Sequence, residues 1–252
     1  MAPKRGKDSA QRTARRSVRR RMVYVFTEGT LTEPSYIDAL IGFKQRAREN
    51  GTRTLPAGEV ESTIEIMWDE RTHNGRRGPQ RSSHERKPLA IVEAAIAHRK
   101  KVTREARGLE QKYQPSVWCL FDRDDHQSVQ RAANMADQAG VNVAYSHPCF
   151  ELWRLLHYQN YTSTFGDGKC GAASNKLRGN PKFVKTYGQR LTSVSEDKAK
   201  LVLPDQVEGG YKQAKKFAKK MNEEHTSPER EKWDPYTDVW RFVEDGIGLT
   251  DY

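Results

Sequence analysis

The feature that most constrains the fold is a continuous apolar segment, residues 117–121, which ends directly at Asp122. A strand with one face in water alternates apolar and polar residues, whereas a strand covered on both faces is apolar throughout. Strands of the second kind occur in parallel sheets that lie between layers of helices. The segment therefore predicts a buried strand of an α/β domain.

The segments around it alternate between strand and helix patterns. Short runs rich in β-branched and aromatic residues predict strands at 22–26, 60–68 and 141–145. Apolar residues at helical spacing predict helices at 34–47, 88–102, 129–140 and 150–158. This order predicts a Rossmann-like open parallel sheet flanked by helices, with its core in residues 22–158.

The remaining segment, 159–252, is predicted to be a mainly helical C-terminal part of one domain that spans 22–252. Residues 162–185 are rich in Gly, Asn, Ser and Lys, which favours a loop or a small subdomain. An apolar stripe opposite lysines predicts a helix at 207–221, and residues 234–243 predict a capped terminal helix.

Positive charge is concentrated ahead of the first predicted strand. The 252 residues include 44 Lys and Arg against 33 Asp and Glu, and residues 1–21 alone hold nine basic residues and one acid. This arm is expected to be flexible, and it serves either as a polyanion-binding element or as a solubilising tail. A basic loop at 69–87 is either substrate-facing or a mobile insertion. The candidate nucleic-acid-binding residues are Arg15, Arg16, Arg19, Arg20, Arg76 and Arg77.

The lengths of the apolar runs and the spacing of the cysteines indicate in which cellular compartment the protein is expected. No run approaches the roughly 18 residues of a transmembrane helix, and no secretory signal is recognisable, so we expect a cytoplasmic protein without a membrane partner. Cys119, Cys149 and Cys170 are spaced for neither a zinc site nor a disulfide framework. We therefore predict three reduced thiols.

Acidic residues follow the ends of the predicted strands. Glu28 follows the first strand, Asp122 and Asp124 follow 117–121, and Glu151 lies shortly after 141–145. Ligand crevices in open α/β sheets lie outside the carboxyl ends of the strands, so these side chains can meet there. Alternate residues of an extended Asp-x-Asp point to the same side. Clustered carboxylates without a His/Cys ligand set favour Mg²⁺ or Mn²⁺.

Each acid also has a simpler interpretation. Asp-x-Asp after a strand can be an ordinary acidic turn, and it also occurs in aspartate-nucleophile phosphatases and glycosyltransferases. Glu33 and Glu151 either join the site or favour the N-terminus of a helix through their charge. His126 either relays protons or is polar surface, and we leave it out of the catalytic set.

Three motifs resemble the RloB family, whose catalytic core has the Toprim fold. They are residues 28–36 (EGTLTEPSY), 117–126 (VWCLFDRDDH) and 146–157 (SHPCFELWRLLH), and residues 235–239 (PYTDV) are similar to the closing segment of the family. The likeness spans about 21–243, with little contribution from the middle loop and from 162–203. One departure is Ser146-His147-Pro148, where the family pattern leads us to expect Asn before the proline.

The resemblance implies a divalent-metal-dependent nuclease of bacterial anti-phage defence, with Glu28, Asp122 and Asp124 as the catalytic, ion-binding residues. Glu33 and Glu151 match further acidic positions of the family. The implied substrate is nucleic acid, either RNA such as tRNA or DNA, and the implied protein partner is an ABC-type ATPase. The sequence leaves a monomer and a homodimer both open.

Two other functions remain alternatives. A non-catalytic nucleic-acid-binding or regulatory subunit could retain the fold, although it would not need carboxylates that repel phosphate. A phosphatase with Asp122 as nucleophile is disfavoured, because such enzymes carry that aspartate on the first strand.

Overall fold

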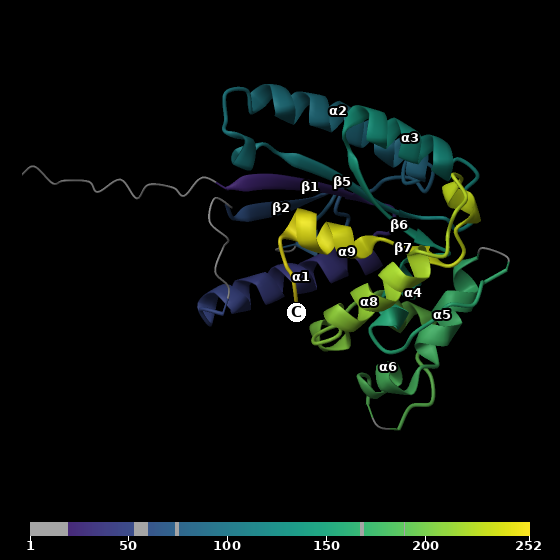
Figure 1. Cartoon of the computed structure of the whole chain (residues 1–252). Coiled ribbons are helices and arrows are strands. Elements are labelled where there is room, and N and C mark those ends of the chain that lie inside the picture. The colour runs from purple at the N-terminus through teal and green to yellow at the C-terminus, as the bar shows by residue number, and fades with distance from the viewer. Residues whose placement is uncertain (1–19, 53–59, 74–75, 167–168, 189) are drawn as a thin grey trace, which may run out of the picture.

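The computed structural model describes residues 20–52, 60–73, 76–166, 169–188 and 190–252. Helices and strands alternate along the first part of the chain, and helices dominate the last third (Figure 1). The strands are β1 (Arg21–Thr27), β2 (Ser62–Met67), β3 (Thr72–His73), β4 (Arg76–Arg77), β5 (Ser116–Asp122), β6 (Asn142–His147) and β7 (Tyr236–Thr237). The longer helices are α1 (Thr32–Glu49), α2 (Pro88–Glu105), α3 (Val129–Ala139), α4 (Phe150–Leu156), α5 (Cys170–Arg178) and α8 (Tyr211–Asn222). The short helical elements are η1 (Gln111–Tyr113), α6 (Pro181–Lys185), α7 (Glu196–Lys200), η2 (Pro204–Gln206), η3 (Arg230–Lys232), α9 (Val239–Arg241) and η4 (Phe242–Ile247).

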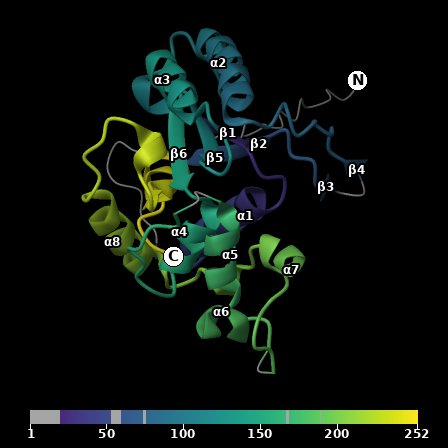
Figure 2. The ribbon, with the colours of Figure 1, turned by 90° about the vertical axis from the view of Figure 1, so that its right-hand side faces the viewer.

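The main sheet has five strands in the order β2-β1-β5-β6-β7. β2, β1, β5 and β6 run parallel, and only the short β7 runs antiparallel, against β6. The predicted α/β class with a mostly parallel sheet is confirmed. Because the parallel strands share one direction, β1, β5 and β6 end at the same edge of the sheet, which Figure 2 presents to the viewer.

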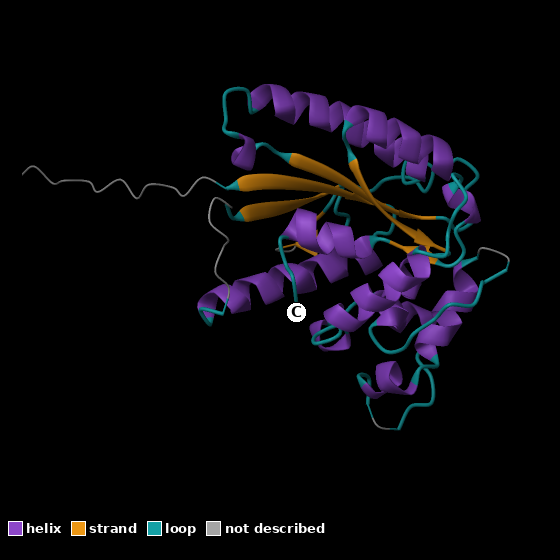
Figure 3. Cartoon of the chain, in the orientation of Figure 1, coloured by secondary structure: helices purple, strands orange, loops and turns teal. Residues whose placement is uncertain are grey.

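Helices cover both faces of the sheet (Figure 3). In β5, Trp118 and Leu120 pack into one buried cluster with residues of α1, α4 and α8, whereas Cys119 and Phe121 pack into a second cluster with α2 and α3. Successive side chains of a strand point to opposite faces, so a strand between two helical layers must be apolar at every position. The continuous apolar pattern of 117–121 has this cause.

Two C-terminal segments differ from the sequence-based expectations. Residues 162–185, for which a loop and a small subdomain were both open, contain the helices α5 and α6, whose Leu177, Phe183 and Val184 are buried. These few apolar residues are too widely spaced to give a clear helical period. The predicted helix at 207–221 begins only at Tyr211, after the left-handed Gly209.

The terminal segment also differs from its prediction. The chain enters it through a cis Asp234–Pro235 bond, adds β7 to the sheet, and only then forms α9 and η4. Asp238 makes no capping bond to α9, because its Oδ1 accepts a hydrogen bond from the Tyr145 amide at 2.7 Å. β7 has only two residues, which is too short to show the alternation of apolar and polar residues by which a strand is recognised in sequence.

Within the described part of the chain, no helix has both the length and the apolar content that a bilayer span requires. The assignment of residues 22–252 to one domain stays a prediction.

Candidate metal and phosphate site

Glu28 and Asp122 meet where β1 and β5 end side by side. The Glu28 amide donates to the Leu120 carbonyl at 3.0 Å, which continues the pairing of the two strands by one residue. The Glu28 side chain then turns back, and its Oε2 accepts a hydrogen bond from the Asp122 amide at 3.0 Å. The two acids, 94 positions apart in sequence, are thus held together by backbone geometry.

Asp122 and Asp124 are held by different backbone donors. Asp122 Oδ2 accepts a hydrogen bond from the Phe150 amide at 3.0 Å, and Asp124 Oδ1 accepts one from the Cys170 amide at 3.3 Å. The segment is not extended as we expected, because β5 ends at Asp122 and Asp124 has a φ of 31°. The Asp124 amide donates to the Pro148 carbonyl, which keeps this turn against the end of β6.

Glu33 lies in the first turn of α1 and points back to the strand end. Its Oε1 accepts a hydrogen bond from the Gly29 amide at 3.1 Å, and the residue is only 4% exposed. A Cβ at position 29 would lie 2.0 Å from Glu33 Oε2, so this approach requires glycine. Glycine at position 29 therefore lets Glu33 approach the end of β1, where the charge of Glu28 acts on it.

The electrostatics of these acids show that they form one cluster. Burial raises the pKa of Asp122 well above its ordinary value, and the charges of Glu33, Glu28 and Glu151 raise it further. Burial likewise raises the pKa of Glu33 to about 7, with Glu28 and Glu151 adding to the effect. Without a cation, part of the cluster therefore stays protonated near neutral pH.

His126 lies against the cluster, although we left it out of the catalytic set. Its Nε2 lies 2.5 Å from Glu28 Oε1, and this hydrogen bond raises the pKa of the imidazole. The imidazole holds Glu28 on the side opposite the Asp122 amide. Its place in the segment 122–126, after the strand, was the only sequence signal for this role.

Glu151 lies in the first turn of α4 beside a disulfide bond. Cys149 and Cys170 are joined, and Glu151 Oε2 lies 3.2 Å from Cys170 Sγ. The prediction of three reduced thiols is contradicted, since of the three cysteines only the buried Cys119 is free. The pairing depends on α5 returning to the end of β6, which the spacing of 21 residues does not reveal.

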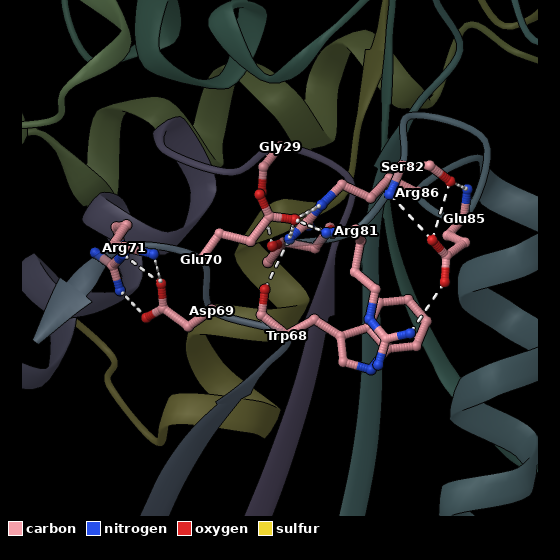
Figure 4. A network of polar contacts seen from close by, with 10 residues as sticks. Gly29, Trp68, Asp69, Glu70, Arg71, Arg81, Ser82, Glu85 and Arg86 are labelled. Carbon is pink, nitrogen blue, oxygen red and sulfur yellow. Dashed lines mark hydrogen bonds and ion pairs between the residues drawn. The ribbon is translucent and has the colours of Figure 1, made fainter. Parts of the chain in front are cut away.

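The basic loop reaches the same edge of the sheet through Arg86 (Figure 4). Arg86 is 6% exposed and donates to the carbonyls of Thr27 at 3.0 Å and Trp68 at 2.7 Å, and it pairs with Glu70 at 2.8 Å. Because Thr27 ends β1 and Trp68 follows β2, this side chain fixes the loop beside Glu28. Nothing in the sequence distinguishes Arg86 from the exposed arginines around it.

Other cations of the loop lie near this anchor. The Arg81 guanidinium lies 4.9 Å from the centre of the Trp68 ring, and that ring packs edge-on against Phe26. Trp68 is thus packed against both Phe26 and Arg81. Lys87 acts electrostatically on His126, which places its charge by the acidic cluster.

The predicted phosphate-binding residues fall into two groups. Arg76 and Arg77 form β4, which pairs with β3 in a small hairpin visible in Figure 2, and both are exposed. Arg20 is exposed at the start of the described chain, next to the first residue of β1. The other three predicted arginines, Arg15, Arg16 and Arg19, lie outside the described residues.

The acidic cluster provides oxygen donors of the kind that Mg²⁺ and Mn²⁺ prefer. Its raised pKa values indicate uncompensated negative charge, which a divalent cation would offset. Among the described residues, the carboxylate oxygens of Glu28, Asp122 and Asp124 do not all lie within 4.8 Å of one another. Each of the three carboxylates is hydrogen-bonded to a different partner, namely the imidazole of His126 and the amides of Phe150 and Cys170. Donor chemistry and charge fit such a cation.

The fold and the cluster define a class: an α/β protein with clustered, partly buried carboxylates at the carboxyl edge of a parallel sheet. A family described as RloB-like protein matches residues 23–245. The match covers most of the chain, so this protein belongs to the RloB-like family, as the three motifs indicated. Neither a curated protein nor a solved structure matches the chain.

Proposed function

We propose that the protein is a divalent-metal-dependent nuclease that cleaves phosphodiester bonds in nucleic acid. The observation that carries the proposal is the acidic cluster, in which burial and the neighbouring acids raise the pKa values of Asp122 and Glu33, together with a loop that carries exposed arginines. A binding module alone has no use for clustered acids that repel phosphate, whereas metal-assisted hydrolysis uses them to hold the ion.

The carboxylates would hold the ion, with Glu28, Asp122 and Asp124 as its ligands and Glu33 and Glu151 beside them. A bound Mg²⁺ or Mn²⁺ would supply Lewis-acid stabilisation of the charge that develops on a phosphodiester. The protein's own part is to fix the ligands. Backbone amides position Asp122 and Asp124, and His126 orients Glu28.

The basic loop would bind the nucleic-acid backbone next to these ligands. Arg86 anchors the loop to the ends of β1 and β2, while Arg76 and Arg77 stay exposed on the hairpin. Contacts of this type position a phosphate backbone without reading base sequence. Arg15, Arg16, Arg19 and Arg20 of the basic arm would add further contacts of the same kind.

Family resemblance extends this proposal in three respects. The substrate would be RNA, with tRNA as the first case to test, or else DNA. The activity would serve as an effector of anti-phage defence or abortive infection in the bacterial cytoplasm. An ABC-type ATPase would act with the nuclease, and a homodimer would be one form of the active protein.

The deciding experiment incubates the purified chain with tRNA, mRNA, single-stranded DNA and duplex DNA, each with Mg²⁺, with Mn²⁺ or with EDTA. We expect cleavage that depends on the metal and is lost in the Asp122→Asn/Asp124→Asn variant. Asp125→Asn is the matched control, because Asp125 is an exposed neighbour of the same charge.

Equal cleavage by the Asp122→Asn/Asp124→Asn variant and the unmodified chain would contradict the assignment. Tight nucleic-acid binding without cleavage of any substrate would instead support a non-catalytic subunit.

A further inference from the structure

A second group of metal-ligand atoms lies beside the acidic cluster and differs from it in chemistry. Cys149, Cys170 and Glu151 each place one potential ligand atom so that all three lie within 4.8 Å of one another. Two of the three are sulfur atoms, which favour Zn²⁺ over Mg²⁺ when they are thiolates. We infer that in the reduced protein these three residues form a site for a thiophilic divalent cation such as Zn²⁺.

The fold holds the ligands together independently of the disulfide bond. Cys149 is fixed at the end of β6, where the next amide, that of Phe150, donates to Asp122. Cys170 is fixed at the start of α5, where its own amide donates to Asp124. The two Cα atoms lie 5.2 Å apart. These bonds do not involve sulfur, so reduction leaves both residues in place.

The spacing suits a tetrahedral ion. Zn–S bonds of about 2.3 Å place two thiolates roughly 3.8 Å apart around Zn²⁺, which is inside the 4.8 Å that contains the three ligand atoms. Glu151 Oε2, 3.2 Å from Cys170 Sγ, supplies the third ligand. Cys149 is buried, whereas Cys170 and Glu151 are partly exposed, so the ion has access from solvent on their side. Three protein ligands leave a fourth position for water.

The disulfide and the metal site exclude each other. A dithiol reductant gives two electrons and two protons to the Cys149–Cys170 bond and is itself oxidised to a disulfide, which leaves two thiols on the protein. Zn²⁺ then replaces the two thiol protons, which pass to the buffer. Reoxidation by a two-electron oxidant such as hydrogen peroxide reforms the disulfide and releases the ion.

The test compares the full chain in its oxidised form and in a form reduced with dithiothreitol and then desalted without oxygen. Zn²⁺ affinity is measured by competition with a chromophoric chelator, and Co²⁺ is added separately to read the thiolate-to-metal charge-transfer band. We expect one Zn²⁺ per reduced chain, bound at least roughly 100-fold more tightly than by the oxidised chain, and the charge-transfer band only after reduction.

Variants separate this site from the carboxylates. Cys149→Ser and Cys170→Ser should abolish the band, Glu151→Gln should weaken Zn²⁺ binding by roughly tenfold or more, and Cys119→Ser should match the unmodified chain. Glu28→Gln should retain the band, since Glu28 belongs to the acidic cluster and makes none of the bonds that hold Cys149 and Cys170.

Equal Zn²⁺ affinity of the reduced and oxidised chains would overturn the inference, and so would unchanged affinity in Glu151→Gln. No step of this test uses nucleic acid, so loss of the proposed nuclease activity would leave its outcome unaffected.

Discussion

Replacing Glu33 by glutamine should change how the stability of the metal-free protein depends on pH. In the folded protein, burial and the neighbouring acids raise the Glu33 pKa from 4.5 to about 7. The group therefore contributes stability that is fully present below pH 4.5 and is lost as the pH rises through about 7. The difference between these pKa values corresponds to about 3 kcal/mol in the free energy of unfolding.

The glutamine side chain has no proton to lose, and the substitution removes a charge that raises the pKa of Asp122. Relative to the unmodified chain, the Glu33→Gln variant should therefore gain about 2.5 kcal/mol between pH 5 and pH 8, measured by urea denaturation in EDTA at both pH values. Glu49→Gln is the control, because Glu49 lies at the exposed end of the same helix. A stability difference that stays the same at both pH values would refute the reasoning.

Three further predictions follow from the same edge of the sheet. Gly29→Ala places a Cβ against Glu33 and should cost about 1–3 kcal/mol in urea denaturation and weaken Mn²⁺ binding, whereas Gly42→Ala, with open space around it, should be neutral or stabilising. Arg86→Ala deprives the carbonyls of Thr27 and Trp68 of their shared buried donor and should cost about 2 kcal/mol by the same assay, so a loss below about 1 kcal/mol would contradict its role as an anchor. Replacing both arginines of β4 by serine should lower the slope of log affinity against log salt for duplex DNA by about 1.8, and an unchanged slope would remove β4 from the binding surface.

The fold was predictable from the sequence where burial leaves a local pattern of apolar residues. The strand at 117–121 could be recognised because both of its faces are covered, and the acids after β1, β5 and β6 could be placed because parallel strands share an edge. Long helices such as α1 and α2 were recognised from their apolar stripes.

The features that sequence reasoning missed depend on contacts between distant segments. The Cys149–Cys170 bond requires α5 to return to β6, and the burial of Arg86 requires two strand ends with free carbonyls side by side. The turn at Asp124 follows from its bond to the Pro148 carbonyl rather than from an intrinsic preference of its residues. No local pattern encodes such partners.

The length of β1 determines how far the basic arm lies from the acidic cluster, because the arm joins the start of this strand and the acids follow its end. The chain before Arg21 joins the sheet at the edge opposite the acids, and the seven residues of β1 separate the two edges by about 23 Å at roughly 3.3 Å per residue. One strand of duplex DNA advances about 3.4 Å per nucleotide along its axis. A DNA duplex bound at both the root of the arm and the acidic cluster would therefore span about seven base pairs, whereas a shorter duplex would reach only one of the two.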